Sequence, residues 1–309
     1  MRNMTAVVLF VLLAAVCLTA RAQQVADPDF KPPIPKPAYR EGRGPVVLID
    51  EAHNNFHTAS GRYQAFAELL RRDGYTVKPS PAKFTKEYLK TARVLVISNA
   101  INERNAGGDW SLPTPSAFTD EEIEAVREWV REGGSLLLIA DHMPAAGAAE
   151  KLALAFGFRF SNGFAMDESK KDGTLFFKLA DGSLKEHPIT KGRNAAERID
   201  TVATFTGSAF QLPAAAQPLF VFGNNVKSLE PEVAWKFDEK TKRVPVKGWA
   251  QGAVLRFGKG RVAAFGEAAM FSAQLAGAQR TPVGMNSPVA KQNPQFLLNV
   301  MHWLTGVLK

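Results

Sequence analysis

The chain has 309 residues, of which 46% are hydrophobic, 22% charged and 10% aromatic, and its formal net charge is +8. This is the composition of a globular protein, and it excludes a disordered, collagen-like or coiled-coil chain. The lysines and arginines are scattered instead of being gathered on one stripe with aromatic residues between them, so we expect no nucleic-acid partner.

The N-terminal segment has the pattern of a secretory signal peptide. Arg2 precedes a nearly continuous apolar run over residues 5–20, and Ala20-Arg21-Ala22 has the small-x-small form of a cleavage site. Because the run is shorter than the ~20 residues that a membrane-spanning helix needs, we expect cleavage after Ala22 and a secreted or periplasmic protein. A membrane is an expected partner only if residues 1–22 stay attached as an anchor.

The mature chain is expected to contain no thiol. The single cysteine, Cys17, lies in the apolar run, so cleavage leaves no cysteine nucleophile, thiolate metal ligand or redox centre. Several prolines then crowd residues 23–44, which predicts an extended, poorly ordered leader. We expect the folded domain to occupy residues 45–309.

Short apolar runs predict the strands of the first half of this domain. They occupy residues 45–50, 93–99 and 135–140, and each is continuous, as in strands that are buried on both faces. Residues 75–79 predict a further strand between the first two of these. The spacing of apolar residues predicts helices over residues 60–73, from Thr119 onward and over residues 148–156. Strands and helices in this succession predict a parallel sheet that is covered on both sides.

Two local signals mark the connections between these elements. Thr119 and Glu122 have the spacing of a capping box, which predicts the start of a helix. The polar loop over residues 101–116 is long for a connection inside a compact domain, which favours a functional lid.

The second half of the domain is more irregular. Residues 158–248 predict a β-rich insertion, and residues 294–304 predict a closing amphipathic helix. The runs on either side of Gly258-Lys259-Gly260 predict a hairpin. A phosphate-binding loop is the alternative for these glycines, but they lack the strand-to-helix context of such loops.

Ionisable and amide side chains gather where the predicted strands end. Ligands of open α/β sheets bind outside the carboxyl ends of the strands, so we expect these side chains to meet in one crevice. The predicted catalytic residues are His53, Asp141, His142 and Glu267. The predicted substrate-binding residues are Glu51, Asn54 and Asn99. Structural roles are the alternative, because Asp50 and Asp141 are of a type that caps turns and His57 fits an exposed position before a helix.

Two kinds of chemistry are open to this cluster. In the first, His53, His142 and Glu267 hold a divalent metal such as Zn²⁺, whose bound water is a nucleophile near neutral pH. In the second, His142 or His53 is a general base that a carboxylate orients, without a metal. The sequence has no compact HExxH motif, and no G-x-S-x-G elbow of a serine hydrolase follows a buried strand.

Three segments follow one another in the order Asp50-Glu51-Ala52-His53, residues 133–142 and residues 258–267. This order resembles the class I glutamine amidotransferase-like superfamily, and more narrowly its exported, uncharacterised branch with a domain of unknown function. The resemblance implies a flavodoxin-like, doubly wound, mostly parallel sheet. It does not carry over glutaminase activity, because those enzymes use a cysteine at a strand-to-helix elbow, where this chain has Asp141-His142.

Two functions are therefore expected as alternatives. The first is hydrolysis of a small polar or carbohydrate-like substrate by the His/Asp/Glu cluster, because ionisable groups that converge on one sheet edge are typical of active sites. The second is a non-catalytic ligand-binding or scaffold domain, because no complete catalytic motif is present in the sequence.

Overall fold

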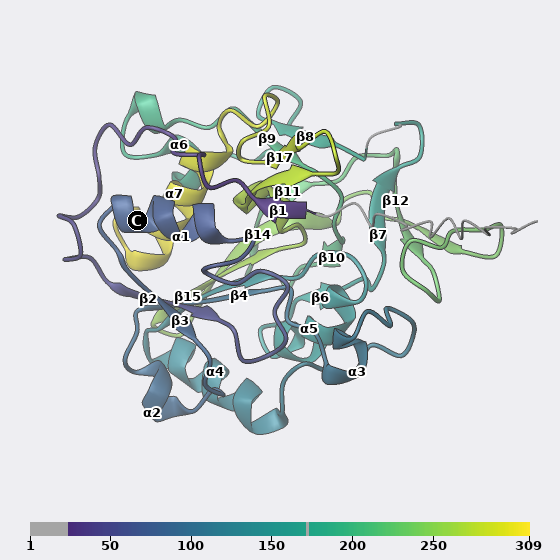
Figure 1. The fold of residues 1–309 in the computed structure, drawn as a ribbon, viewed down its shortest axis with the longest axis horizontal. Coiled ribbons are helices and arrows are strands. Elements are labelled where there is room, and N and C mark those ends of the chain that lie inside the picture. Colours follow the sequence, from purple (N-terminus) through teal and green to yellow (C-terminus); the bar gives the residue numbers. More distant parts are fainter. Residues whose placement is uncertain (1–23, 171–172) are drawn as a thin grey trace, which may run out of the picture.

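The computed structural model describes residues 24–170 and 173–309, so the predicted signal peptide lies outside the described residues. Within these two ranges, no helix combines the length and the apolar character that crossing a membrane requires. The centre of the described part is a nine-stranded, mixed sheet with helices on both faces (Figure 1).

Five neighbouring strands of this sheet run parallel. Across the sheet they are β3 (Thr76–Ser80), β2 (Val46–Asp50), β4 (Val94–Ser98), β5 (Ser135–Ile139) and β15 (Gly260–Phe265). Along the chain these are the second, first, third, fourth and fifth parallel strands. The prediction of a mostly parallel sheet is confirmed, and each apolar run forms a strand within one residue of its predicted bounds.

Antiparallel strands extend the sheet beyond β15. The hairpin predicted around Gly258 is present, because β14 (Ala250–Phe257) pairs antiparallel with β15. β14 also pairs with β10 (Phe210–Gln211) and β11 (Gln217–Val221), and β10 pairs with β6 (Arg159–Phe160). Residues 158–248 therefore supply strands to the edge of the main sheet.

The parallel strands bury side chains on both faces. In β2, Val47 and Ile49 belong to a core shared with α1 (Gln64–Arg72) and α7 (Asn293–Thr305), whereas Leu48 belongs to the opposite core. That second core lies against α2 (Lys86–Leu89), α4 (Asp120–Glu132) and α5 (Ala145–Leu154). Successive side chains of a strand point to opposite faces, so burial on both sides requires a continuous apolar run.

The predicted helices form, although two of them start elsewhere. The Thr119 side chain accepts the N–H of Glu122, and the Glu122 carboxylate accepts the N–H of Thr119, so the predicted capping box is confirmed. α1 begins at Gln64 instead of residue 60, because the residues before it form turns. α5 begins at Ala145 instead of residue 148.

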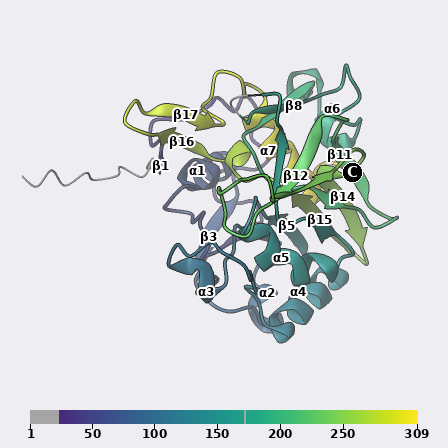
Figure 2. The same cartoon turned by 90° about the vertical axis from the view of Figure 1, so that its right-hand side faces the viewer.

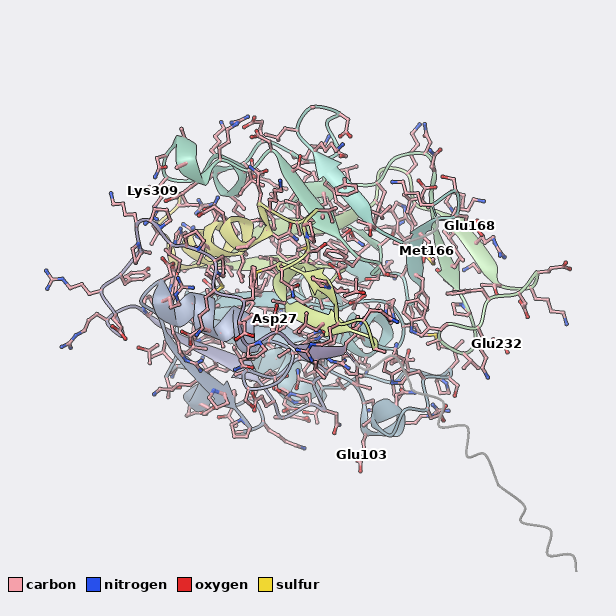
Figure 3. All side chains as sticks on the ribbon, turned by 45° about the horizontal axis from the view of Figure 1, so that its top comes forward. Asp27, Glu103, Met166, Glu168, Glu232 and Lys309 are labelled. Carbon is pink, nitrogen blue, oxygen red and sulfur yellow. The ribbon has the colours of Figure 1, made fainter. Side chains whose placement is uncertain are left out.

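Three small sheets lie beside the main sheet. They are β1 (Gln24–Ala26) with β16 (Ala273–Ala276) and β17 (Thr281–Gly284), β7 (Phe164–Asp167) with β12 (Val226–Glu230) and β13 (Lys242–Pro245), and β8 (Leu175–Lys178) with β9 (Thr201–Thr204). Figure 2 shows the first of these next to α1. Glu168 and Glu232, at the ends of β7 and β12, lie on a projecting margin of the molecule (Figure 3). The remaining short helices are α3 (Glu103–Ala106), α6 (Pro188–Lys191), η1 (Ala195–Glu197) and η2 (Ala269–Phe271).

Residues 24–44 lie along the domain instead of forming a separate, poorly ordered leader. β1 pairs with β16, and the N–H of Ala38 donates to the buried carboxylate of Asp73 at 2.7 Å. Tyr39 packs edge-on against Tyr75 with 5.1 Å between the ring centroids. The prolines keep the segment extended, and the residues between them attach it to the core.

Candidate functional site

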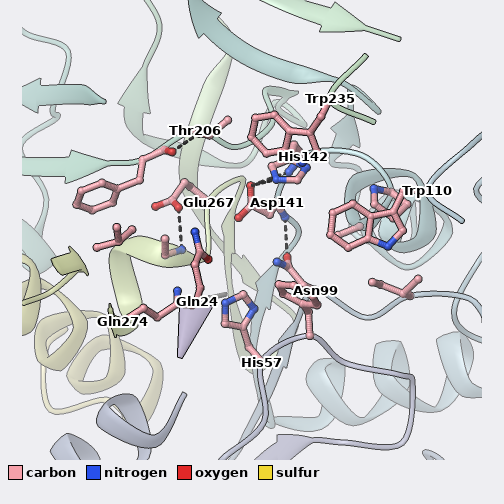
Figure 4. Close-up of a pocket in the computed structure, with 17 residues that line it drawn as sticks. Gln24, His57, Asn99, Trp110, Asp141, His142, Thr206, Trp235, Glu267 and Gln274 are labelled. Atoms are coloured by element: carbon pink, nitrogen blue, oxygen red, sulfur yellow. Dashed lines mark hydrogen bonds and ion pairs between the residues drawn. The ribbon is translucent and has the colours of Figure 1, made fainter. Parts of the chain in front are cut away.

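A pocket of about 120 Å³ lies where the carboxyl ends of β4, β5 and β15 meet the small sheet β1–β16–β17. Its walls come from segments that are far apart in the sequence (Figure 4). The polar residues that matter most for its chemistry are His57, Asn99, Asp141, His142, Glu267 and Gln274. The pocket therefore lies at the sheet edge where the sequence predicted a site.

Asn99 and Asp141 follow neighbouring parallel strands and are joined by a hydrogen bond. Asn99 has a φ of 48°, in the left-handed region that asparagine tolerates better than most residues, and its Oδ1 accepts the N–H of Asp141 at 2.9 Å. Asp141 Oδ1 accepts the N–H of His142 at 2.7 Å, and Oδ2 accepts the N–H of Ala268 at 3.3 Å. These bonds fix the Asp141 carboxylate between the ends of β5 and β15.

The His142 ring is held in one orientation and one tautomer. Its Nδ1 lies 2.7 Å from the carbonyl oxygen of Met143, which can only accept, so Nδ1 carries a proton and Nε2 has the lone pair of the neutral ring. Nε2 lies 4.0 Å from Asp141 Oδ1. The ring stacks on Phe164 and lies edge-on to Trp235, with centroids 4.3 and 4.7 Å away. Nε2 is thus the atom that can accept a proton in the pocket.

Glu267 is a buried carboxyl group at the end of β15. Its Oε1 and Oε2 accept the N–H groups of Ala269 and Met270 at 2.7 and 2.8 Å. Burial, together with the negative charge of Asp141, raises the pKa of Glu267 well above its usual range. A buried carboxyl group whose pKa is raised in this way can serve as an acid.

His53 does not line the pocket, although the sequence predicted it as a catalytic residue and a metal ligand. Its buried ring lies between Phe84 and Phe118, with both centroids 4.7 Å away. Nδ1 lies 2.9 Å from Asp50 Oδ1, and Nε2 lies 3.0 Å from Glu122 Oε1. Both ring nitrogens are bonded to carboxylates, so His53 ties the end of β2 to the start of α4.

The predicted substrate-binding residues are divided between the pocket and a turn. Asn99 lines the pocket. Glu51 instead accepts the N–H of Ala59 at 2.8 Å, and Asn54 Nδ2 donates to the carbonyl oxygen of Ile101 at 3.3 Å. In the turn after β2, the side chains of Glu51 and Asn54 form hydrogen bonds with nearby backbone groups. The sequence alone does not distinguish a polar residue with this role from one that binds a ligand.

The metal set predicted from the sequence is not assembled. In residues 24–170 and 173–309, no three or more His, Cys, Asp or Glu side chains are grouped to hold a metal ion. His142 and Glu267 line the pocket, but His53 is held by Asp50 and Glu122. The predicted Zn²⁺ ligands therefore do not form one site.

Several residues of the pocket were not predicted. His57, expected at an exposed position, is buried in the pocket wall. Trp110 comes from the loop over residues 101–116, whose length was the signal for a functional loop. Trp235 is half exposed at a φ of 67°, and no sequence signal marked it. A bulky residue in this conformation is strained, and such strain is concentrated at functional sites.

Gly207→Ala is expected to disturb the pocket, because the backbone of Gly207 packs directly against the end of β15. At its φ of 108°, a Cβ atom would clash with the carbonyl oxygen of Gly266 and lie 2.9 Å from the Cβ of Glu267. We expect the free energy of unfolding to fall by about 3 kcal/mol, measured in urea. Gly248→Ala is the control, since its φ is 80° but no atom lies within 4 Å of the added Cβ. An equal loss in both variants would contradict a steric role for Gly207.

The fold and the pocket together define a mixed α/β protein with a pocket at the carboxyl edge of a mostly parallel sheet. No protein-family model matches the chain, and no curated protein matches it.

Solved structures do resemble it. The N-terminal domain of mmIFT52 is 14% identical with a TM-score of 0.56, and the match covers 84% of this chain and 97% of that domain. A ThuA-like protein from Bacteroides uniformis is 13% identical with a TM-score of 0.46, covering 85% and 92% of the two chains. Cytoplasmic protein STM3548 from Salmonella typhimurium is 15% identical with a TM-score of 0.47, covering 84% and 98%. Of these three, the mmIFT52 domain shows a shared fold, and at such identity it shows the fold alone.

Proposed function

We propose that this protein is an exported hydrolase of a small, polar, carbohydrate-like substrate, and that Asp141, His142 and Glu267 carry the reaction. The observation that supports it is the convergence of these three side chains on one pocket. The His142 ring is fixed through Nδ1, which leaves Nε2 available to accept a proton. General acid–base catalysis requires this geometry together with a group that can hold a proton, and the raised pKa of Glu267 provides one.

In the proposed reaction, water attacks the electrophilic carbon of the substrate and passes a proton to His142 Nε2. The bond to the leaving oxygen breaks, and that oxygen takes a proton from the Glu267 carboxyl group. Asp141 provides the negative charge that favours protonation of Glu267. Its Oδ1 lies 4.0 Å from His142 Nε2. The proton then returns from His142 to Glu267 directly or through water, which restores both groups.

The class of substrate is proposed from the pocket wall. Phe56, Trp110 and Trp235 offer aromatic surface, and Phe56 and Trp235 are 38% and 50% exposed. Sugar rings present apolar C–H faces and polar hydroxyl edges, which suits aromatic surface beside a few fixed polar groups. Asn99 and Gln274 supply such amide groups in the same pocket.

We also propose a flavodoxin-like, amidotransferase-like fold and a secreted or periplasmic location. The parallel strands lie in the order second, first, third, fourth, fifth, which is the order of flavodoxin-like sheets. With the sequence segments around Asp50 and Asp141, this order supports an amidotransferase-like protein of the branch without the catalytic cysteine. The signal-peptide pattern before Gln23 supports secretion or a periplasmic location.

The alternative is a ligand-binding domain without catalysis, and one observation favours it. Both oxygens of Asp141 and both oxygens of Glu267 accept backbone N–H groups. Carboxylates that are bonded in this way are also typical of structural caps. Under this alternative the pocket binds a sugar and releases it unchanged.

The activity test compares variants on 4-nitrophenyl and methyl glycosides. His142→Gln is expected to lower kcat/KM about 100-fold or more on both, because the base is removed. Glu267→Gln is expected to impair the methyl glycosides far more, because 4-nitrophenolate leaves without a proton. The wild-type rate on methyl glycosides should fall as the pH rises through the raised pKa of Glu267.

Glu68→Gln is the matched control, because Glu68 is 44% exposed and lies outside the pocket, on α1. It should retain full activity. Equal rates in wild type, His142→Gln and Glu267→Gln would contradict the hydrolase. Binding of a sugar without turnover by the wild type would favour the binding domain instead.

A further inference from the structure

Two buried polar atoms in the wall of the pocket have no hydrogen-bond partner within the described residues. They are Nδ1 of His57 and Oε1 of Gln274, and the two side chains are 3% and 1% exposed. Both residues line the pocket, so the two unpaired atoms lie at the proposed ligand site. An unpaired buried polar atom is costly, which is why such atoms in native proteins require an explanation.

The Gln274 side chain is fixed at its other end. Its Nε2 donates to Ser272 Oγ at 2.7 Å, and Ser272 Oγ donates to the carbonyl oxygen of Ala269 at 2.9 Å. With the amide nitrogen engaged, Oε1 is the atom left to accept a bond. The backbone is fixed as well, because β16 pairs with β1 on one side and β17 on the other.

The His57 ring is held by its neighbours and kept neutral. It packs against Tyr63 and Phe56, with centroids 4.6 and 5.6 Å away. The Arg62 guanidinium lies 3.6 Å above the Phe56 ring and donates through Nε to the carbonyl oxygen of Gln24. Burial and the charge of Arg62 lower the pKa of His57 to about 3.

We infer that His57 Nδ1 and Gln274 Oε1 are specificity-determining atoms, which form hydrogen bonds with uncharged polar groups of the ligand. This rests on the proposed function, since it concerns the ligand of the same pocket. A neutral imidazole and an amide oxygen suit hydroxyl groups and give no ion pair to a charged ligand. Both atoms are buried behind the pocket surface, and changes of side-chain rotamer on binding are common.

The placement of these residues separates recognition from reaction. Asp141, His142 and Glu267 follow the strands β5 and β15 of the main sheet, whereas His57 precedes α1 and Gln274 belongs to the small sheet. The two sets of residues come from different parts of the fold. A site built to bond a substrate hydroxyl rejects analogues that lack it, because its own polar groups are then left unpaired.

The test uses the mature chain with His57→Phe and Gln274→Met, which replace the unpaired atoms by apolar groups of similar size. His57→Phe removes an unpaired polar atom, so its Tm should rise by about 2–4 °C. Gln274→Met also removes the hydrogen bond from Nε2 to Ser272 Oγ, so the affinity of this variant for sugar, and not its Tm, tests the inference. Affinity for the best sugar among D-glucose, D-galactose, D-mannose and myo-inositol, measured by calorimetry, should fall about tenfold or more. Gln279→Met, at an exposed glutamine, should change neither quantity.

The outcomes separate this inference from the proposed function. Unchanged affinity in both variants would overturn the inference. If His57→Phe is less stable because phenylalanine overpacks the site, the affinity of Gln274→Met still tests the inference. If none of the four compounds binds the wild type, the proposed substrate class fails, and the Tm of His57→Phe still tests whether His57 Nδ1 is unpaired.

Discussion

Asp73→Ala is expected to lower the free energy of unfolding by about 3 kcal/mol or more, which is among the largest losses for a single substitution in this chain. The Asp73 carboxylate is fully buried, and its Oδ2 lies 2.7 Å from Nε2 of His302, which is also fully buried. Its Oδ1 accepts the N–H of Ala38 at 2.7 Å. The substitution therefore leaves the buried Nε2 of His302 and the half-buried N–H of Ala38 without this partner, in addition to a cavity.

Urea unfolding measures this loss, and limited trypsin digestion locates it. Because Asp73 attaches the segment that contains Ala38, the variant should be cut faster at Lys36 and Arg40 than the wild type. Asp29→Ala is the control, since Asp29 is exposed on the same segment. A loss for Asp73→Ala no larger than that of the control would show that the bonds to His302 and Ala38 contribute little.

His53→Gln is expected to destabilise the protein most at mildly acidic pH. Burial by itself lowers the pKa of His53, but the hydrogen bonds and charges of Asp50 and Glu122 outweigh it, so the pKa is raised above its ordinary value. The folded state thus favours the imidazolium. Its contribution to stability is complete below the pKa of the unfolded chain and is lost as the pH rises through the higher folded pKa.

The measurement is the difference in unfolding free energy between wild type and His53→Gln from pH 6 to pH 9. We expect a difference of about 2–4 kcal/mol at pH 6 that becomes smaller with rising pH, because glutamine does not titrate. The contribution of Glu122 to stability has the opposite pH dependence. Burial raises its pKa, but the Thr119 and Phe84 N–H groups and His53 outweigh this and lower it, so its contribution is lost at acidic pH. A difference that does not change with pH would contradict an imidazolium at His53.

The parallel part of the fold could be predicted because its strands are buried on both faces. A run such as Val94–Ser98 has no polar interruption, and the turn signals around it set its limits. The small sheets could not be predicted in the same way. β1 and β17 have three and four residues and are not fully buried, so they have no continuous apolar run to mark them.

The candidate site could be predicted only as far as the sheet itself positions its residues. Asn99, Asp141 and Glu267 directly follow parallel strands, and the pairing of those strands brings the three side chains to one edge. His53 follows β2 by three residues, and its position depends on Glu122, which is 69 residues further along the chain. Such a contact depends on how α4 packs, and the spacing of residues around His53 does not predict that packing.

The strand β1 has a practical consequence for anyone who produces this protein. Gln24, where the described chain begins, is itself part of the pocket wall, whereas Lys309 is not. An affinity tag fused ahead of Gln24 would start at the mouth of the cavity and compete with small molecules for it. Screening should therefore use a tag on the C-terminal side, or one that a protease removes from the N-terminal side.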